Sequence, residues 1–187
     1  MIEVTYIDHM GSDLSVVNAA RVSFGKKSDW LPRVHNGEAK ALSAKDCRLI
    51  MYLAKHKHKS PFNHAFATFH VKAPIFVARQ LVKHEYMPWN EISRRYVDEA
   101  PEFYTPPVWR GRSADKKQGS DGVVTDINPL MVSDMMVQAY EDYIYLLGKG
   151  VCPEQARMVL PQSMYTEWYW TGSLAAWARV CQQRLYR

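Results

Sequence analysis

The sequence predicts a fold that combines α-helices with β-strands. Residues 3–7 alternate polar and apolar side chains, and residues 65–72 are rich in β-branched and aromatic residues, which are patterns typical of strands. Residues 128–148 repeat apolar side chains at the three-to-four spacing of an amphipathic helix. Because 187 residues with 47% hydrophobic and 23% charged side chains can build a sizeable core, one domain over residues 1–187 is expected.

Start and stop signals set the expected elements of the first half. Ser43, with Asp46 three residues later, predicts a capped helix start. Pro61 interrupts the helical pattern, because a proline biases the preceding residue away from helical backbone angles. Pro74 predicts a new helix, since the first helical turn tolerates proline. The elements expected in this half are a strand at 3–7, a helix at 14–22, a polar loop at 26–40, a helix from 43 to 56–58, a strand at 65–72 and a helix from 74 to 83–84.

Two polar stretches interrupt the second half. Residues 85–96 show no regular period and are expected to form an ordered loop, where ligand contacts are common. Residues 109–126 contain three glycines and hardly an apolar residue, which predicts a mobile loop or lid. Asn128 and Pro129 predict an N-cap followed by a helix start. The elements expected after them are a long helix ending at 148 or 150, a short helix from 153 to 160, a strand at 165–171 and a final helix at 173–186.

The chain is basic and rich in aromatic residues. Its formal net charge is +5, and it contains six Trp and eleven Tyr residues, several of them beside Arg or Lys. This mixture suits planar, anionic ligands, and it is also typical of nucleic-acid-binding modules. Composition alone therefore does not distinguish an enzyme that acts on nucleotides from a nucleic-acid-binding module.

Cysteine usage and hydropathy narrow the class of protein. Cys47, Cys152 and Cys181 are an odd number without a short CxxC spacing, which argues against a disulfide framework and a structural zinc site, so no metal is expected. No stretch approaches the roughly 20 apolar residues that cross a bilayer, and no targeting segment is visible. A cytoplasmic protein without membrane partners is expected, located in the host-cell cytoplasm if the source is viral.

The densest group of polar side chains lies within residues 80–96. The run Ser93-Arg94-Arg95 offers a hydroxyl, backbone N–H groups and guanidinium forks, which together suit a phosphate monoester. A solvated helix end with salt bridges is the structural alternative. Because the cluster is compact and is not spread along a face, a mononucleotide fits it better than a polymer.

This segment resembles the signature of the flavin-dependent thymidylate synthases, the ThyX family, which is R-H-R-x-x-S-x-N-E-x-S-x-R-Y. Six positions match it with the family's spacing: His84, Asn90, Glu91, Ser93, Arg95 and Tyr96. Three positions depart from it, because Lys83 and Glu85 replace the two flanking arginines and Pro88 replaces the first serine.

The resemblance covers most of the chain in the family's order. Residues 19–24 are similar to its A-A-R-V-S segment, residues 58–64 to H-x-[ST]-P-F-E-H, and residues 154–161 to its A-R-x-x-L-P block. Residues 69–80 follow the strand-to-helix run that leads into the motif. The resemblance implies an α+β fold with a small antiparallel sheet flanked by helices. It also implies that the chain is naturally short or lacks a C-terminal segment, since family members continue beyond the position of Arg187.

By resemblance, the reaction is reductive methylation of dUMP to dTMP. Methylenetetrahydrofolate gives the carbon and FAD, reduced by NADPH, delivers the hydride, so the chain's own task is positioning and electrostatics. The resemblance further implies a homotetramer with shared active sites. Three alternatives stay open: an enzyme that methylates or hydroxymethylates UMP or dUMP at C5, a relative without catalysis, and a nucleic-acid-binding module.

The resemblance assigns site residues by matching positions. The residues expected to bind dUMP are Gln80, Lys83, Glu91, Ile92, Ser93, Arg94, Arg95, Arg157 and Arg184. Those expected to bind FAD are Ser60, Lys83, His84, Glu85, Asn90 and Glu91, with His58 as a possible flavin or folate neighbour. His58 and His84 also have a structural interpretation as satisfied histidines.

Arg184 and Ser93 have distinct expected roles. Arg184 matches the family arginine on the uracil, where a cation would stabilise negative charge on the pyrimidine and raise electron density at C5; it is the expected catalytic residue. Ser93 is expected to bind phosphate and not to act as a nucleophile, because no general base stands at an obvious spacing.

Further departures concern the expected flavin site. Glu85 would repel flavin phosphates unless it faces elsewhere or the site is rearranged. Ser173 and Arg179 stand where the family often has asparagines for FAD.

Overall fold

The computed structural model describes residues 1–32, 41–97, 99–115 and 119–185. Helices and strands occur together in this part of the chain, which confirms the α+β prediction. The strands are β1 (Glu3–Met10), β2 (Phe66–Pro74), β3 (Trp89–Glu91), β4 (Trp109–Arg112), β5 (Ser120–Val124) and β6 (Tyr165–Ser173). The α-helices are α1 (Asp13–Arg21), α2 (Ala44–Lys55), α3 (Ile75–Leu81), α4 (Pro129–Gly148), α5 (Pro153–Ala156) and α6 (Leu174–Arg184), and the short 3₁₀ helices are η1 (Val22–Phe24), η2 (Ser60–His64) and η3 (Arg157–Val159).

The chain divides into two compact units that alternate along the sequence. The first unit contains Met1–Glu3, Lys72–Gln80 and Glu91–Glu167. The second unit contains Val4–Val71, Leu81–Asn90 and Trp168–Arg187. Strands β2 and β6 each contribute residues to both units, and the units are described separately below.

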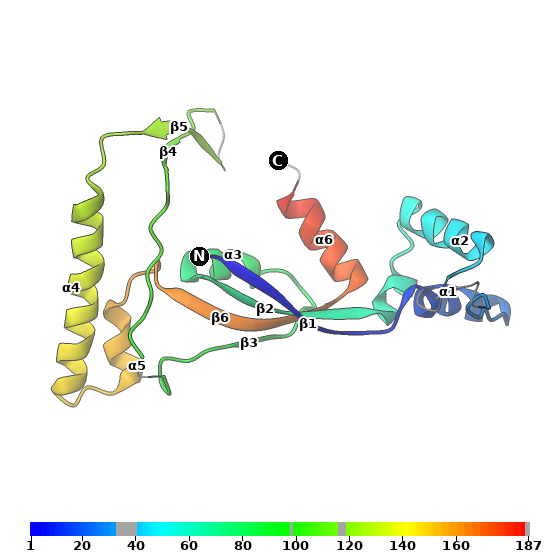
Figure 1. Ribbon diagram of the computed structural model, residues 1–187, viewed down its shortest axis with the longest axis horizontal. Helices are drawn as coiled ribbons and strands as arrows, with labels where there is room; N and C mark the ends of the chain where they lie inside the picture. Colours follow the sequence, from blue (N-terminus) through cyan, green and yellow to red (C-terminus); the bar gives the residue numbers. More distant parts are fainter. Residues whose placement is uncertain (33–40, 98, 116–118, 186–187) are drawn as a thin grey trace. The chain divides into compact units, whose positions relative to one another are not determined.

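A four-stranded antiparallel sheet, in the order β1-β2-β6-β3, is the main sheet (Figure 1). In the second unit, Leu174 N donates to Ala65 O at 2.9 Å, and in the first unit Ile75 N donates to Met164 O at 2.9 Å. These pairings run in opposite chain directions, as an antiparallel ladder between β2 and β6 requires. Because β6 has neighbours on both sides, it places the residues that follow it in α6.

Tryptophan rings fill the core of the second unit. Trp168 and Trp170 on β6 are 1% and 4% exposed. Trp89 of β3 stacks on Trp168 with ring centroids 4.3 Å apart, and Trp177 of α6 meets Trp170 edge-on at 4.9 Å. Aromatic pairs of this kind add about 0.5–1.5 kcal/mol each beyond the area they bury. The short strand β3 is therefore held by a side-chain stack as well as by its ladder.

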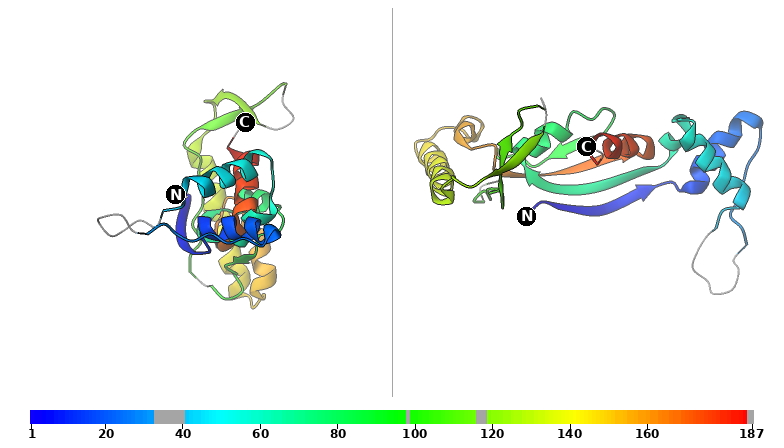
Figure 2. Two further views of the ribbon diagram at one scale, coloured as in Figure 1. Left: turned by 90° about the vertical axis from the view of Figure 1, so that its right-hand side faces the viewer. Right: turned by 90° about the horizontal axis from the view of Figure 1, so that it is seen from above.

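Helices α1 and α2 follow the end of β1 in the second unit (Figure 2), and a buried carboxylate joins them. Asp46 is 3% exposed, and its Oδ1 accepts from Arg21 Nε at 3.0 Å, from Arg21 Nη2 and from Ser28 Oγ at 3.0 Å. Ser43 Oγ donates to Asp46 Oδ2 at 2.7 Å and accepts from Asp46 N at 3.1 Å. The helix start expected at Ser43 is thus confirmed, and Asp46 also bonds beyond its own helix.

The first unit contains a hairpin and the long helix α4. Strands β4 and β5 pair antiparallel, with Trp109 opposite Val124. Asn128 caps α4, because its Oδ1 accepts from Leu130 N at 3.0 Å, as expected from the sequence. Helix α5 packs beside α4 (Figures 1 and 2). In the same unit, Lys72 Nζ donates to Glu102 Oε1 at 2.6 Å.

Two sequence predictions are wrong. The sequence predicts a loop throughout residues 85–96, but residues 89–91 form β3, since their pairing partner and the stack on Trp168 lie far away in the sequence. It predicts a mobile loop or lid at residues 109–126, but these hold the β4–β5 hairpin, with residues 116–118 outside the described part. Part of the loop expected at 26–40 and the end of the helix expected at 173–186 also lie outside the described residues.

Within the residues that the structure describes, none of the helices combines the length and apolar character that crossing a bilayer requires.

The carboxylate of Asp46 should be a major source of stability in the second unit. We expect Asp46→Asn to lower the free energy of unfolding by about 3–5 kcal/mol, because the buried Arg21 charge loses its partner. Denaturation in urea measures this change. The exposed Asp29 offers a matched control, since Asp29→Asn should change stability by no more than about 0.5 kcal/mol.

The same carboxylate predicts a pH dependence. The hydrogen bond from Ser43, followed by those from Arg21 and Ser28, holds the pKa of Asp46 below its ordinary 3.8 despite the opposing effect of burial. The stabilisation is therefore complete above pH 3.8 and is lost as the pH falls through the lowered pKa. An Asp46→Asn variant as stable as the parent at about pH 7 would contradict this account.

Candidate active site

The sequence-predicted site residues divide between the two units. The first unit holds Gln80, Glu91, Ile92, Ser93, Arg94, Arg95 and Arg157, all of them expected nucleotide ligands. The second unit holds His58, Ser60, Lys83, His84, Glu85, Asn90 and Arg184, most of them expected at the flavin. The two expected ligand sets thus belong largely to different units.

A tight turn after β3 brings Ser93 and Arg95 together in the first unit. Tyr96 N donates to Ser93 O at 3.0 Å, which closes the turn. Ser93 Oγ accepts from Arg95 N at 3.3 Å and from Arg95 Nε at 3.2 Å. The Arg95 guanidinium also lies over the ring of Tyr96, 4.9 Å from its centroid. The hydroxyl and the guanidinium fork are therefore held side by side on an exposed turn.

This geometry bears on the role of Ser93. A nucleophilic serine needs a neighbouring base that accepts its proton, whereas the N–H groups of Arg95 are donors. A hydroxyl beside a guanidinium is a suitable pair for binding a phosphate oxygen. The arrangement favours the phosphate-binding role that the sequence predicts.

The other nucleotide candidates of the first unit lie on different elements. Thr166 Oγ1 donates to Glu91 Oε1 at 2.6 Å, so the carboxylate at the end of β3 is fixed to β6. Ile92 N donates to Glu167 O at 2.9 Å and continues that ladder. Arg94 donates to the carbonyl of Glu99, and this contact directs its guanidinium along its own segment.

Two further nucleotide candidates are exposed. Gln80 lies in the last turn of α3, and Arg157 begins η3. Both side chains are therefore accessible to a ligand.

A histidine and an arginine form the centre of the candidate site in the second unit. His84, 7% exposed, follows α3 in a turn, and its Nε2 accepts from Arg184 Nε of α6 at 3.3 Å. Burial, followed by the charges of Arg184 and Arg179, lowers the pKa of His84 below its ordinary 6.5. A neutral ring that accepts at Nε2 carries its proton on Nδ1. His84 thus holds a guanidinium without adding a charge of its own.

Arg179 joins the same turn from α6. Its Nη2 donates to the backbone carbonyl of Glu85 at 2.5 Å. In the sequence, Arg179 is noticeable only as a departure from the family pattern. The sequence analysis does not predict its contact with Glu85. A signal is present, because a positive charge is lost at position 85 and another is gained at position 179, but nothing local connects the two positions.

The remaining flavin candidates lie on other segments of the second unit. Lys83 lies beside His84 in the turn, and Asn90 lies in β3; both are exposed. Ser60 begins η2. His58 stacks on Tyr52 of α2 with ring centroids 6.1 Å apart, a contact that fits the structural interpretation of this histidine.

The residues around His84 fit a flavin nucleotide chemically. Lys83, Arg179 and Arg184 supply cationic N–H donors suited to phosphate oxygens. Trp170 lies beside His84, with ring centroids 6.0 Å apart, but at 4% exposed it belongs to the core and supports the histidine from behind. The three cations match the diphosphate of a flavin dinucleotide.

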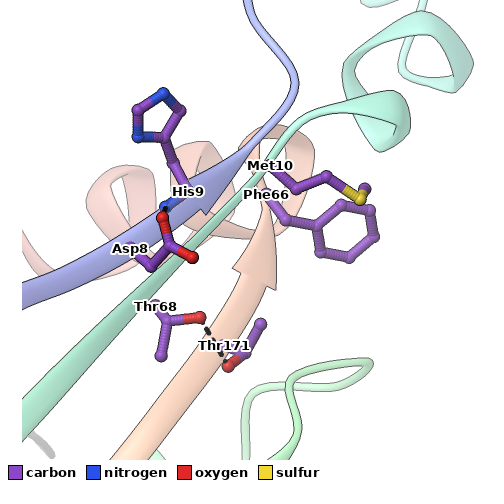
Figure 3. A pocket seen from close by; sticks show the side chains of 6 residues that line it. All are labelled: Asp8, His9, Met10, Phe66, Thr68 and Thr171. Carbon is purple, nitrogen blue, oxygen red and sulfur yellow. Dashed lines mark hydrogen bonds between the residues drawn. The ribbon is translucent and has the colours of Figure 1, made fainter.

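A separate cavity of about 300 Å³ lies in the second unit between β1, β2 and β6 (Figure 3). It is lined by Asp8, His9, Met10, Phe66, Thr68 and Thr171. Its polar groups are engaged with one another, since Thr68 and Thr171 share a hydrogen bond of 2.9 Å and His9 N donates to Asp8 at 2.7 Å. None of the sequence-predicted site residues lines it, so it is not part of the candidate active site. Among the described residues, no three His, Cys, Asp or Glu side chains gather as a metal site would require.

The sequence profile of the thymidylate synthase complementing protein family matches residues 5–187. The chain belongs to this family. Flavin-dependent thymidylate synthases are among its relatives. One from Thermus thermophilus is 43% identical over 172 residues, covering 91% of this chain and 59% of the relative. The one from Thermotoga neapolitana is 44% identical over 168 residues, covering 90% and 69%.

A similar solved structure is that of the UMP/dUMP methylase PolB from Streptomyces cacaoi. Bound to 5-Br dUMP, it matches with a TM-score of 0.77 and 33% identity over 94% of this chain and 75% of that chain. Bound to 5-Br UMP, it matches with a TM-score of 0.75 over 97% and 75%. The present chain thus spans about three quarters of the length of the solved PolB chain but only 59% of the length of the Thermus relative.

The contact between His84 and Arg184 predicts the titration of the histidine. We expect the pKa of His84 to lie below 6.5 in the parent and to rise in Arg184→Gln, because a neighbouring positive charge is removed. Histidine-labelled NMR measures this shift, with His84→Gln to assign the signal. Since the neutral ring is the bound form, its contribution to stability is present above pH 6.5 and is lost as the pH falls below that value.

Arg48, an exposed arginine of α2 in the same unit, supplies the control, because it is not among the charges that lower the pKa of His84. Arg48→Gln should leave the midpoint of His84 unchanged. A midpoint that is equally unaffected in Arg184→Gln would show that the two side chains do not interact in solution.

Proposed function

We propose that this protein is a flavin-dependent thymidylate synthase that converts dUMP to dTMP. Methylenetetrahydrofolate is the carbon donor, NADPH is the reductant, and the reaction takes place in the cytoplasm. The observation that carries this proposal is the hydrogen bond from Arg184 to the buried His84, which fixes a guanidinium next to the family signature. The family membership and the flavin-dependent relatives support the same activity.

The turn at Ser93 and Arg95 binds the nucleotide phosphate. Its hydroxyl and guanidinium are held together before any ligand arrives, so little side-chain freedom has to be lost on binding. Further proposed nucleotide ligands, each by its match to a family position, are the exposed Arg157 and Gln80 of the first unit and the exposed Lys83 of the second unit. Ile92, Glu91 and Arg94 frame this turn through the contacts described above.

Arg184 acts on the pyrimidine. A guanidinium beside the uracil carbonyls stabilises negative charge on the ring, and this raises electron density at C5, the carbon that attacks the one-carbon unit. Because His84 is neutral, it orients Arg184 without competing for that negative charge. Arg184 is therefore the catalytic residue of the proposal, and His84 positions it.

The proposed FAD ligands of the second unit are Ser60, Lys83, His84, Asn90 and the turn at Glu85, with His58 as a neighbour of the flavin or folate. Glu91, which belongs to the first unit, is a further proposed FAD ligand by its match to the family motif. Reduced flavin, when bound, supplies the hydride of the reaction. The chain's own residues position the ligands and provide positive charge for the phosphates.

Exposed apolar residues support a homotetramer with shared active sites. Helix α4 exposes Leu130, Met131 and Met135 to 71%, 55% and 65%, and β1 exposes Val4 and Tyr6 to 64% and 53%. A 20-residue helix with apolar side chains on several faces is normally buried against a partner. Further copies of this chain are the proposed partners.

A second candidate function is C5 methylation of UMP as well as dUMP. The observation that favours it is the similarity to PolB, which is described as acting on both nucleotides. The departures at Lys83, Glu85 and Pro88 also leave room for a changed substrate or a hydroxymethyl product. A nucleic-acid-binding module is not favoured, because the signature cations occupy compact turns.

The test is an assay of the purified protein with FAD, NADPH, methylenetetrahydrofolate and dUMP carrying tritium at C5. We expect tritium release and a product whose mass is that of dTMP, with dUMP preferred over UMP. Preference for UMP, or a product heavier by one oxygen atom, would replace the first proposal by the second.

Arg184→Ala tests the role of the proposed catalytic residue. We expect turnover to fall by about 10²–10³-fold, comparable to the loss of one charge-stabilising donor, with the flavin absorption spectrum retained. Arg48→Ala, an exposed arginine on α2, should leave turnover unchanged. Binding of oligonucleotides by a colourless, inactive parent protein would contradict the proposal.

A further inference from the structure

The turn after α3 has an unusual charge pattern. Residues 83–85 read Lys-His-Glu where the signature motif reads Arg-His-Arg. A lysine at position 83 keeps a positive charge, but a glutamate at position 85 replaces a cation by an anion. If a diphosphate is bound at this turn, the carboxylate at this position would weaken its binding.

Helix α6 places the guanidinium of Arg179 against the same turn. Arg179 Nη2 donates to the carbonyl oxygen of Glu85 at 2.5 Å. This contact uses one N–H of the five that a guanidinium carries, so donors remain for a phosphate. The contact is made to the backbone, which leaves the Glu85 carboxylate exposed and able to face away from an anion.

Side-chain hydrogen bonds fix the first turn of α6, which precedes Arg179. Ser173 Oγ caps α6 by accepting from Ala176 N at 3.2 Å and donates to Asn63 at 2.7 Å. One turn further, Trp177 Nε1 donates to Ala67 O at 3.1 Å. These bonds fix α6 to β2 and η2 on both sides of its first turn, so the guanidinium of Arg179 is held at Glu85 by the fold of the second unit.

We propose that Arg179 replaces, from α6, the positive charge that the signature motif carries at position 85, and that its guanidinium binds the diphosphate of FAD. This inference rests on the proposed function, because it deepens the flavin site of that proposal. The positive charge has moved from the turn to the helix that packs against it. Glu85 and Arg179 are then a compensating pair, in which the arginine offsets the anion that the turn has gained.

The test is a set of three variants whose affinity for FAD is measured directly. Flavin fluorescence titration of the purified protein gives the Kd without any catalytic step. We expect Arg179→Asn to raise the Kd for FAD by about tenfold to a hundredfold, as for the loss of a hydrogen bond to a charged group. The double variant E85R/R179N, which restores an arginine in the turn, should recover the affinity to within about threefold of the parent. Arg179→Lys, which keeps the charge but loses the fork, should fall in between.

The controls separate this inference from its alternatives. Arg48→Asn should bind FAD like the parent, and thermal unfolding of each variant checks that it is folded. The Kd for dUMP is measured in parallel, because a nucleotide phosphate is the other source of the same chemistry. A rise in the Kd for dUMP with unchanged FAD affinity would assign Arg179 to the substrate and overturn the inference.

The failure of this inference is distinguishable from that of the proposed function. Normal FAD affinity in Arg179→Asn, or no recovery in the double variant, overturns the inference and leaves thymidylate synthesis standing. A parent protein that binds no FAD overturns both. Flavin binding that depends on Arg179 in a protein without tritium release keeps the inference and removes the proposed reaction.

Discussion

The antiparallel pairing of β6 with β2 and β3 is the constraint on which the site in the second unit depends. Strand β6 carries the buried rings of Trp168 and Trp170 and leads directly into α6 through the N-cap Ser173. Because α6 follows β6 directly, the position of β6 determines the direction of α6. This direction brings Arg179 and Arg184 to the turn after α3. Loss of the ladder would therefore remove the two guanidiniums from His84 and Glu85 together.

The charged groups of the molecule serve two different purposes. Arg21 and Asp46 are both largely buried and satisfy each other, so their interaction stabilises the packing of α1 on α2 and leaves nothing for a ligand. Arg95 contacts a hydroxyl, Arg179 contacts a carbonyl and Arg184 contacts a neutral ring. Each of these three contacts orients a guanidinium through an uncharged acceptor, which does not cancel its charge. This difference distinguishes the proposed ligand-binding arginines from the structural one.

The part of the fold that the sequence predicts correctly is the part determined by short-range interactions. The caps at Ser43 and Asn128 are formed by residues two or three positions away, and the local pattern predicts both. Strand β3 has only three residues and exists because distant β6 supplies its ladder and Trp168 supplies its stack, so no local period indicates it. The hairpin over β4 and β5 is missed because its glycines and charges resemble a loop. For the candidate site, matching positions to a family motif predicts roles for His84 and Arg184, which the structure brings into contact. The contact of Arg179 with Glu85 depends on the packing of α6 and needs the structure.

We propose that the arginines of α6 hold the ligands of a flavin-dependent C5 methylation. A crystal structure of the protein with FAD and dUMP bound is the decisive experiment. We expect a flavin phosphate oxygen within hydrogen-bond distance of the Arg179 guanidinium, and Arg184 bonded to His84 while it contacts the pyrimidine. Flavin phosphates bound away from α6, with Arg184 turned into solvent, would show that these arginines do not hold the ligands.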